Sequence, residues 1–141
     1  MEEKTQSESA KILVVDDIQT NLIVAKGLLE PYRVQVDLCE SGKAAIAAVR
    51  TKNYDLVLMD YRMPEMDGIE AVRRIRAFGV DNPHYENVPI VAFTAEMIRD
   101  VKKMLLQSGF DDYLAKPAST AELDTMIEKW IPMSKQLKTL A

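Results

Sequence analysis

Five polar side chains follow apolar runs of the sequence and together could handle a phosphoryl group. They are Asp16, Asp17, Asp60, Thr94 and Lys116. Converging carboxylates repel one another unless a cation lies among them. An oxygen-rich acidic cluster suits Mg²⁺, a hard cation that keeps several waters and binds phosphate oxygens. A lysine and a threonine hydroxyl beside such a cluster would complete a site for phosphoryl transfer.

Each of these residues alone also has a simpler interpretation. Asp16 or Asp17 could cap a helix at its amino end, Thr94 could cap the helix that follows it, and Lys116 could be a solvated lysine. Single short motifs often match by chance. The shared site is favoured because such residues follow four separate apolar runs.

The apolar runs alternate with helical patterns along the whole chain, which predicts a parallel sheet. The predicted strands are residues 11–15, 34–39, 55–59, 89–93 and 112–115, and the predicted helices are 20–29, 43–51, 69–78, 97–108 and 120–131. The first, third and fourth strands are apolar on both faces, as buried parallel strands are.

Local signals support these boundaries. Ser41 can cap the second helix, Ser119 and Glu122 form a capping-box pattern at the fifth, and Gly109 stands where the fourth helix should end. Residues 79–88 are interpreted as a turn-rich connection. Five βα units with right-handed crossovers predict an α/β fold, a doubly wound three-layer sandwich that binds ligands at the carboxyl ends of its strands.

Length and composition exclude several classes of protein. The 141 residues fit one domain, residues 11–132, between a flexible tail at 1–10 and a tail at 133–141. A net charge of −4 offers no basic surplus for direct binding to nucleic acid. One cysteine, Cys39, and one histidine, His84, make neither an internal disulfide nor a Cys/His zinc site. Without an apolar run long enough for a signal peptide or membrane span, the expected location is cytoplasmic, with no membrane insertion.

Three other features receive structural interpretations. Arg73, Arg74 and Arg76 are interpreted as the solvated basic face of the third helix. His84 is expected at the surface, and Trp130 is expected to anchor the last helix to the core.

Four ordered motifs identify a family resemblance. They are VVDD (14–17), LVLMDYRMPEMDG (56–68), FTA (93–95) and YLAKP (113–117). With them, the chain resembles the receiver domains of bacterial two-component response regulators over residues 11–132. The resemblance implies the flavodoxin-like fold, with strand order 2-1-3-4-5. The ending IEKWIP resembles receivers at the carboxyl end of hybrid sensor histidine kinases.

The resemblance also implies roles for individual residues. Asp60 would be the phosphoacceptor. Mg²⁺, or Mn²⁺ in its place, would be held by Asp17, by Asp16 through water, by Asp60 and by the backbone carbonyl of Arg62. Lys116, Thr94 and Ala95 would stabilise the phosphoryl group, and Lys116–Pro117 resembles the family's cis peptide.

A switch and a lid complete the expected site. The Thr94 hydroxyl would bond a phosphoryl oxygen on Asp60, leaving space for Tyr113 to pack inward and reshape the neighbouring face. The side chains of Arg62 and Glu96 would overhang the site, where an ion pair between them could obstruct attacking water. Ala95 between them would leave room for the donor.

The implied function is a signalling switch rather than an enzyme, with only self-directed phosphotransfer and autodephosphorylation. An aspartate carboxylate can attack phosphorus and give an acyl phosphate. The donor would be a histidine kinase or a histidine phosphotransfer domain, and the output a downstream protein or an effector in the same chain.

Two rival functions stay open at this point. A Mg²⁺-dependent phosphatase of the haloacid dehalogenase type would carry a DxD motif after the first strand, but Ile18 and Gln19 occupy the second acidic position, and no cap segment is present. A flavodoxin-like binding module would need a glycine-rich phosphate loop, which is absent, and an acidic pocket would repel the FMN phosphate.

Overall fold

The computed structural model describes residues 9–95 and 100–132. Its strands are β1 Lys11–Val15, β2 Gln35–Cys39, β3 Leu56–Met59, β4 Ile90–Thr94 and β5 Asp112–Ala115. The α-helices are α1 Gln19–Leu29, α2 Gly42–Thr51, α3 Gly68–Ala77, α4 Pro83–Asn87, α5 Val101–Ser108 and α6 Thr120–Trp130, with short 3₁₀ turns at Glu30–Tyr32 and Phe78–Val80. None of the helices described is long and apolar enough to cross a membrane.

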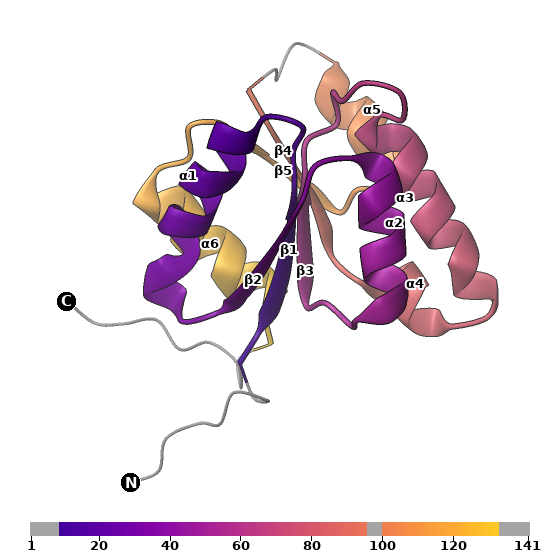
Figure 1. Cartoon of the computed structure of the whole chain (residues 1–141), viewed down its shortest axis with the longest axis horizontal. Helices are drawn as coiled ribbons and strands as arrows, with labels where there is room; N and C mark the ends of the chain where they lie inside the picture. The colour runs from indigo at the N-terminus through magenta and orange to yellow at the C-terminus, as the bar shows by residue number, and fades with distance from the viewer. Residues whose placement is uncertain (1–8, 96–99, 133–141) are drawn as a thin grey trace, which may run out of the picture.

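The five strands form one parallel sheet in the order β2-β1-β3-β4-β5, which confirms the predicted fold. Helices α1 and α6 cover one face, and α2, α3 and α5 cover the other (Figure 1). Each face buries its own apolar cluster. The cluster under α1 and α6 includes Leu22, Ala25 and Leu29 of α1. The cluster on the other face includes Val72 and Ile75 of α3 and Leu105 of α5. A sheet buried on both faces explains why β3 is apolar at every position and β4 at every position before Thr94.

The predicted helix caps are confirmed. Ser41 Oγ accepts a hydrogen bond from the Ala44 amide at 3.0 Å. Ser119 and Glu122 form a reciprocal capping box at α6, with hydrogen bonds of 2.9 and 3.1 Å. Gly109 ends α5 with a φ of 119°, a conformation in the left-handed region that glycine adopts without strain. These signals are local, which is why the sequence alone was enough to place them.

Two expectations need correction, one in the connection before β4 and one at the end of α3. It contains a helix, α4, whose amino end is capped by Asn82. Arg76 is no part of a solvated face, because its guanidinium donates hydrogen bonds to the carbonyls of Tyr85, Glu86, Val88 and Gly109 and pairs with Asp111 at 2.7 Å. We call this set of contacts the Arg76 clamp. It ties the end of α3 to α4 and to the end of α5.

The last helix is anchored as expected. Trp130 packs on the cluster beneath α1 and α6, and its Nε1 donates to Asp112 Oδ2 at 3.0 Å. His84 is half-buried in α4, where its ring meets that of Tyr85 edge to face. The first residues of the predicted helix 97–108 lie outside the described part of the chain, and α5 is described from Val101.

Candidate functional site

Three carboxylates meet at the carboxyl end of the sheet. Asp16 and Asp17 follow β1 and Asp60 follows β3, and because these strands are neighbours in register, with Val15 beside Met59, the two strand ends lie side by side. Each carboxylate offers an oxygen within 4.8 Å of the others. Asp16 and Asp60 are buried and Asp17 is exposed. We call Asp16, Asp17 and Asp60 the acidic rim.

Backbone amides hold two of these carboxylates in place. Asp16 Oδ1 accepts a hydrogen bond from the Ile18 amide at 2.9 Å, and Asn21 Nδ2 donates to its Oδ2 at 3.2 Å. Asp60 Oδ1 accepts from the Arg62 amide at 3.0 Å. These bonds orient the carboxylates before any ligand is bound, which lowers the cost of assembling a binding site.

Lys116 supplies the positive charge at the rim. It follows β5, and the Lys116–Pro117 peptide is cis, as the resemblance implied. Its Nζ forms an ion pair with Asp16 Oδ2 and lies 3.5 Å from Asp60 Oδ2. The same Nζ lies 5.2 Å from the centre of the Phe93 ring. One ammonium therefore faces both buried carboxylates, and its charge opposes their mutual repulsion.

Gly68 shapes the loop that carries Asp60. Its amide donates to the Tyr61 carbonyl at 2.9 Å. A Cβ atom at this position would lie 2.6 Å from the Asp60 carbonyl oxygen and 2.7 Å from Tyr61 Cα. The close approach leaves no room for a side chain. Asp67 then starts α3, since its carboxylate accepts from the Glu70 amide at 2.9 Å.

The two expected switch residues stand on adjacent strands and on one face of the sheet. Thr94 is buried at the end of β4, and its carbonyl accepts from the Lys116 amide at 2.9 Å. Tyr113 of β5 pairs with Ala92, two residues before Thr94. Residues two apart on a strand share a face. The half-buried Tyr113 ring packs on the cluster beneath α3 and α5, and Lys102 Nζ lies 5.0 Å from its centre.

The remaining expected residues divide between the described and undescribed parts of the chain. Ala95 is exposed beside Thr94, and Arg62 is exposed two residues after Asp60. Glu96, the expected lid partner of Arg62, lies outside the described residues.

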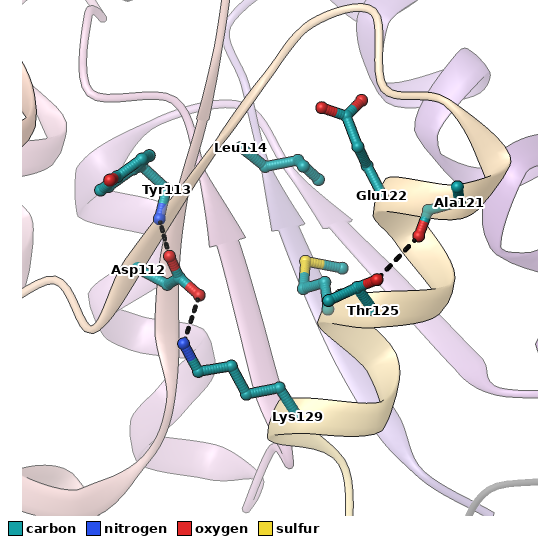
Figure 2. A pocket seen from close by; sticks show the side chains of 8 residues that line it. Asp112, Tyr113, Leu114, Ala121, Glu122, Thr125 and Lys129 are labelled. Atoms are coloured by element: carbon teal, nitrogen blue, oxygen red, sulfur yellow. Dashed lines mark hydrogen bonds and ion pairs between the residues drawn. The ribbon is translucent and has the colours of Figure 1, made fainter.

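A separate cavity of about 340 Å³ lies between β5 and α6. Figure 2 shows Leu114 and Thr125 directed into it, while Tyr113 projects from the other side of the strand. The cavity is lined by none of the acidic rim. Burial alone would raise the pKa of its Asp112, but hydrogen bonds from Trp130, the Tyr113 amide and Lys129 outweigh burial and lower it. Asp112 is thus engaged in structural contacts, and the acidic rim is the better candidate site.

Sequence reasoning assigned no role to three residues that build the site. Asn21 bonds Asp16 from the first turn of α1, Phe93 lies beneath the Lys116 ammonium, and Gly68 packs against Asp60. A polar residue five positions after Asp16 was a usable signal for Asn21. The position of Phe93 relative to Lys116 depends on the pairing of β4 with β5, for which the sequence carries no local signal.

Comparison with known proteins agrees with this geometry. The family described as response regulator receiver domain matches residues 12–128. The sensor protein GacS of Pseudomonas syringae pv. syringae is 44% identical over 124 residues, which cover 88% of this chain and 14% of GacS. The chain thus corresponds to a small part of that relative.

Two solved structures are similar over most of their length. One is the receiver domain of the sensor histidine kinase PA1611 from Pseudomonas aeruginosa PAO1, with a magnesium ion coordinated in its active site cleft. It has a TM-score of 0.77 and 36% identity, covering 86% of this chain and 97% of that one. The other is the receiver domain of Ssk1 from Saccharomyces cerevisiae, co-crystallised with the histidine phosphotransfer protein Ypd1. Its TM-score is 0.79 at 29% identity, covering 92% and 93% of the two chains.

Proposed function

The chain belongs to the response regulator receiver domain family, and from that premise we propose that Asp60 accepts a phosphoryl group from a phosphohistidine on a partner protein. One observation carries the proposal. The Asp60 carboxylate is buried, lies within 4.8 Å of Asp16 and Asp17, and has the Lys116 ammonium 3.5 Å away. A nucleophilic carboxylate with charge-neutralising groups around it is what transfer of a dianionic group requires.

The transfer step follows from these contacts. A carboxylate oxygen of Asp60 attacks phosphorus, the bond from phosphorus to the imidazole nitrogen breaks, and its electron pair stays on that nitrogen. The product is an acyl phosphate. The Arg62 amide holds Asp60 Oδ1, and the Lys116 ammonium offsets charge on the transferred group. Thr94 and Ala95 would stabilise the phosphoryl oxygens from the end of β4.

The donor set of the acidic rim fits a hard divalent cation. Carboxylate oxygens are the ligands that Mg²⁺ prefers. Asp17, Asp60 and the Arg62 carbonyl would hold it, with Asp16 bonding through water, and Mn²⁺ could replace it. When bound, the cation supplies positive charge to the phosphoryl oxygens. The magnesium ion in the PA1611 receiver, which is 36% identical, supports this proposal.

We assign the donor to the class of histidine kinases and histidine phosphotransfer proteins. The Ssk1 receiver, at 29% identity, was crystallised with a protein of the second kind. Because the chain corresponds to 14% of GacS, its output could be a separate protein or another part of a longer polypeptide. In either case Thr94 and Tyr113 would pass the change at Asp60 to the face formed by α5, β5 and α6, and the domain would act only on its own phosphoryl group.

The structure gives no support to either rival function. A flavodoxin-like module would bind an anionic phosphate where this chain places three carboxylates. A phosphatase of the haloacid dehalogenase type would use a nucleophile after β1, whereas the residues there, Asp16 and Asp17, lie beside Asp60 as part of one cluster.

Acetyl phosphate tests the proposal without a protein donor. In the presence of Mg²⁺, the intact mass should rise by one phosphoryl group. Asp60→Asn should abolish the gain, and EDTA should block it because the carboxylates and the anionic donor repel one another without the cation. Asp81→Asn, at an exposed loop position, is the matched control and should label normally. Normal labelling of Asp60→Asn, or labelling that needs no metal, would contradict the proposal.

A further inference from the structure

Asp16 is a buried carboxylate that three hydrogen-bond donors share. The residue is 2% exposed. Its Oδ1 accepts from the Ile18 amide at 2.9 Å, while its Oδ2 accepts from Asn21 Nδ2 at 3.2 Å and forms the ion pair with Lys116 Nζ. One oxygen of Asp16 therefore has a neutral donor from α1 and a cationic donor from the segment after β5.

The cationic donor also faces a second acceptor. Lys116 Nζ lies 3.5 Å from Asp60 Oδ2, and a phosphoryl group on Asp60 would add negative charge on that side. An ammonium that is drawn toward phosphoryl oxygens pairs less closely with Asp16. A buried carboxylate that loses its cation is strongly destabilised unless other donors hold it. Phosphorylation of Asp60 therefore makes Asp16 depend on its neutral donors.

Asn21 is well placed to be such a donor. It lies in the first turn of α1, next to Leu22, which is 2% exposed and packs on the core beneath the helix. Its amide carries no net charge, so a phosphoryl group attracts it far less than it attracts an ammonium. The helix itself does not explain the residue, because the cap position is Ile18 and asparagine is a poorer helix former than alanine.

We propose that Asn21 is a positioning residue for Asp16. It keeps this carboxylate in place when Lys116 turns toward a phosphoryl group on Asp60, so the inference rests on the proposed function of Asp60. In the unphosphorylated protein, the ion pair with Lys116 holds Asp16 and the Asn21 amide adds to it. In the phosphorylated protein, the amides of Asn21 and Ile18 hold it instead. Loss of the Asn21 amide should therefore weaken the phosphorylated state far more than the unphosphorylated one.

Beryllofluoride with saturating Mg²⁺ tests the proposal without turnover, because it imitates a phosphoryl group on Asp60. In an NMR titration, Asn21→Ala should raise the dissociation constant of beryllofluoride roughly tenfold, which corresponds to about 1.4 kcal/mol. The melting temperature of the unliganded variant should stay within about 3 °C of the wild type, since Lys116 still pairs with Asp16. Asn53→Ala is the matched control and should change neither quantity, because Asn53 is exposed and precedes β3, at the end of the sheet opposite the acidic rim.

Two further replacements of Asn21 separate its amide from its size. Asn21→Leu keeps the volume but removes the donor, and should bind beryllofluoride as weakly as Asn21→Ala. Asn21→Gln keeps a neutral amide on a longer side chain, and should recover part of the lost affinity. Equal affinities for the glutamine and leucine variants would contradict a role for the amide.

Removal of Lys116 tests the same relationship without any ligand. In a Lys116→Met background, Asp16 has already lost its cation and depends on its neutral donors. Asn21→Ala should therefore lower the melting temperature by about 4 °C more in this background than in the wild type. An equal change in the two backgrounds would show that the two donors act independently, and would overturn the proposal.

The outcomes distinguish this inference from the function on which it rests. A lower melting temperature of unliganded Asn21→Ala, with an unchanged dissociation constant for beryllofluoride, would reduce Asn21 to a structural contact and overturn the inference. A wild-type protein that neither binds beryllofluoride in the presence of Mg²⁺ nor is labelled by acetyl phosphate would instead count against the proposed function of Asp60.

Discussion

Gly68 and Asp60 are in main-chain contact across the loop that follows β3, so close that a Cβ on Gly68 would lie 2.6 Å from the Asp60 carbonyl oxygen. The position of the proposed nucleophile therefore depends on the absence of a side chain eight residues later in the sequence. Backbone cannot give way as the tip of a flexible side chain can, so any larger residue must displace the loop.

Gly68→Ala should lower both stability and phosphoryl transfer. We expect a loss of about 1–3 kcal/mol in the free energy of unfolding, as for an overpacked core, and slower labelling of Asp60 by acetyl phosphate. Urea denaturation and intact-mass kinetics measure the two effects. Gly27→Ala is the matched control and should change stability in the opposite direction, because its Cβ has free space. Equal stabilities for Gly68→Ala and the wild type would disprove the steric argument.

Thr94→Ala should separate phosphorylation from its distant effect. The Thr94 hydroxyl is proposed to couple the phosphoryl group to Tyr113 and takes no part as nucleophile. Beryllofluoride with Mg²⁺ should shift NMR signals near Asp60 in both proteins, but the shifts at Tyr113 should fall by more than about half in the variant. If the Tyr113 shifts keep their full size in Thr94→Ala, Thr94 is not part of the switch.

Arg62 and Glu96 should control the lifetime of the acyl phosphate if they form a lid. Arg62→Ala and Glu96→Ala should each speed dephosphorylation, and about 1.4 kcal/mol of barrier corresponds to a tenfold change in rate. The double variant should be less than additive in log rate because the two side chains would act together. Decay of the radiolabelled acyl phosphate gives these rates. Wild-type decay in all three variants would show that lifetime is set elsewhere.

Arg76 should contribute far more to stability than its neighbour Arg74. Arg76 bonds the Gly109 carbonyl, 33 residues away, through both Nε and Nη2, at 3.0 and 2.9 Å. Arg76→Met should lower the free energy of unfolding by about 2–4 kcal/mol, since several partly buried carbonyls lose a charged donor. Arg74 forms an exposed pair with Glu70 at 2.6 Å, so Arg74→Met should cost less than about 1 kcal/mol. Similar urea midpoints for the two variants would show that the Arg76 clamp does not stabilise the fold more than the Arg74 pair does.

Asp37 should make stability depend on acid pH. Hydrogen bonds from Lys52, and then from Tyr54, lower the pKa of Asp37 below its ordinary value, against burial, which would raise it. Because the folded pKa is the lower one, ionised Asp37 stabilises the fold above its unfolded pKa, and this contribution is lost as the pH falls through the folded pKa. The melting temperature should therefore fall less steeply below about pH 4 in Asp37→Asn than in the wild type.

Tyr54→Phe gives an intermediate test of the same contact. It removes the 2.6 Å hydrogen bond to Asp37 but leaves the 2.8 Å pair with Lys52. The acid loss should then be smaller than in the wild type and complete at a higher pH, because the folded pKa of Asp37 lies closer to its unfolded value. Asp81→Asn, at an exposed carboxylate, should leave the profile unchanged. Identical dependence of the melting temperature on acid pH in the wild type and in Asp37→Asn would show that Asp37 does not contribute to it.

The sheet and the acidic rim were predictable because both follow from short-range patterns and a topological rule. Runs apolar on both faces mark buried parallel strands, and such strands end at one edge, where Asp16, Asp17 and Asp60 gather. Asn82 and Pro83 also match a helix start, in which a capping residue is followed by proline at the first helical position. The segment was interpreted as turn-rich because α4 is only five residues long, too short to show a helical pattern.

Long-range polar contacts were beyond the sequence pattern. Lys116 and Asp16 are 100 residues apart, and their pairing depends on strand order and on side-chain conformation. Arg76 was misinterpreted because periodicity counts it as one of three neighbouring arginines, and its acceptors are backbone carbonyls, which every residue carries. The sequence pattern does not predict which carbonyl oxygens lack a hydrogen-bond partner within a helix or sheet, because that depends on the fold.

The Arg76 clamp has a consequence for how this part of the protein tolerates sequence change. Its acceptors at Tyr85, Glu86, Val88 and Gly109 are all main-chain oxygens. Every amino acid presents the same carbonyl, so the clamp depends on the path of the main chain and not on the identity of the residues along it. In a saturation mutagenesis library, we expect position 76 to accept almost no replacement while Glu86, exposed on α4, accepts many. One invariant side chain would thus permit a freely varying surface around it.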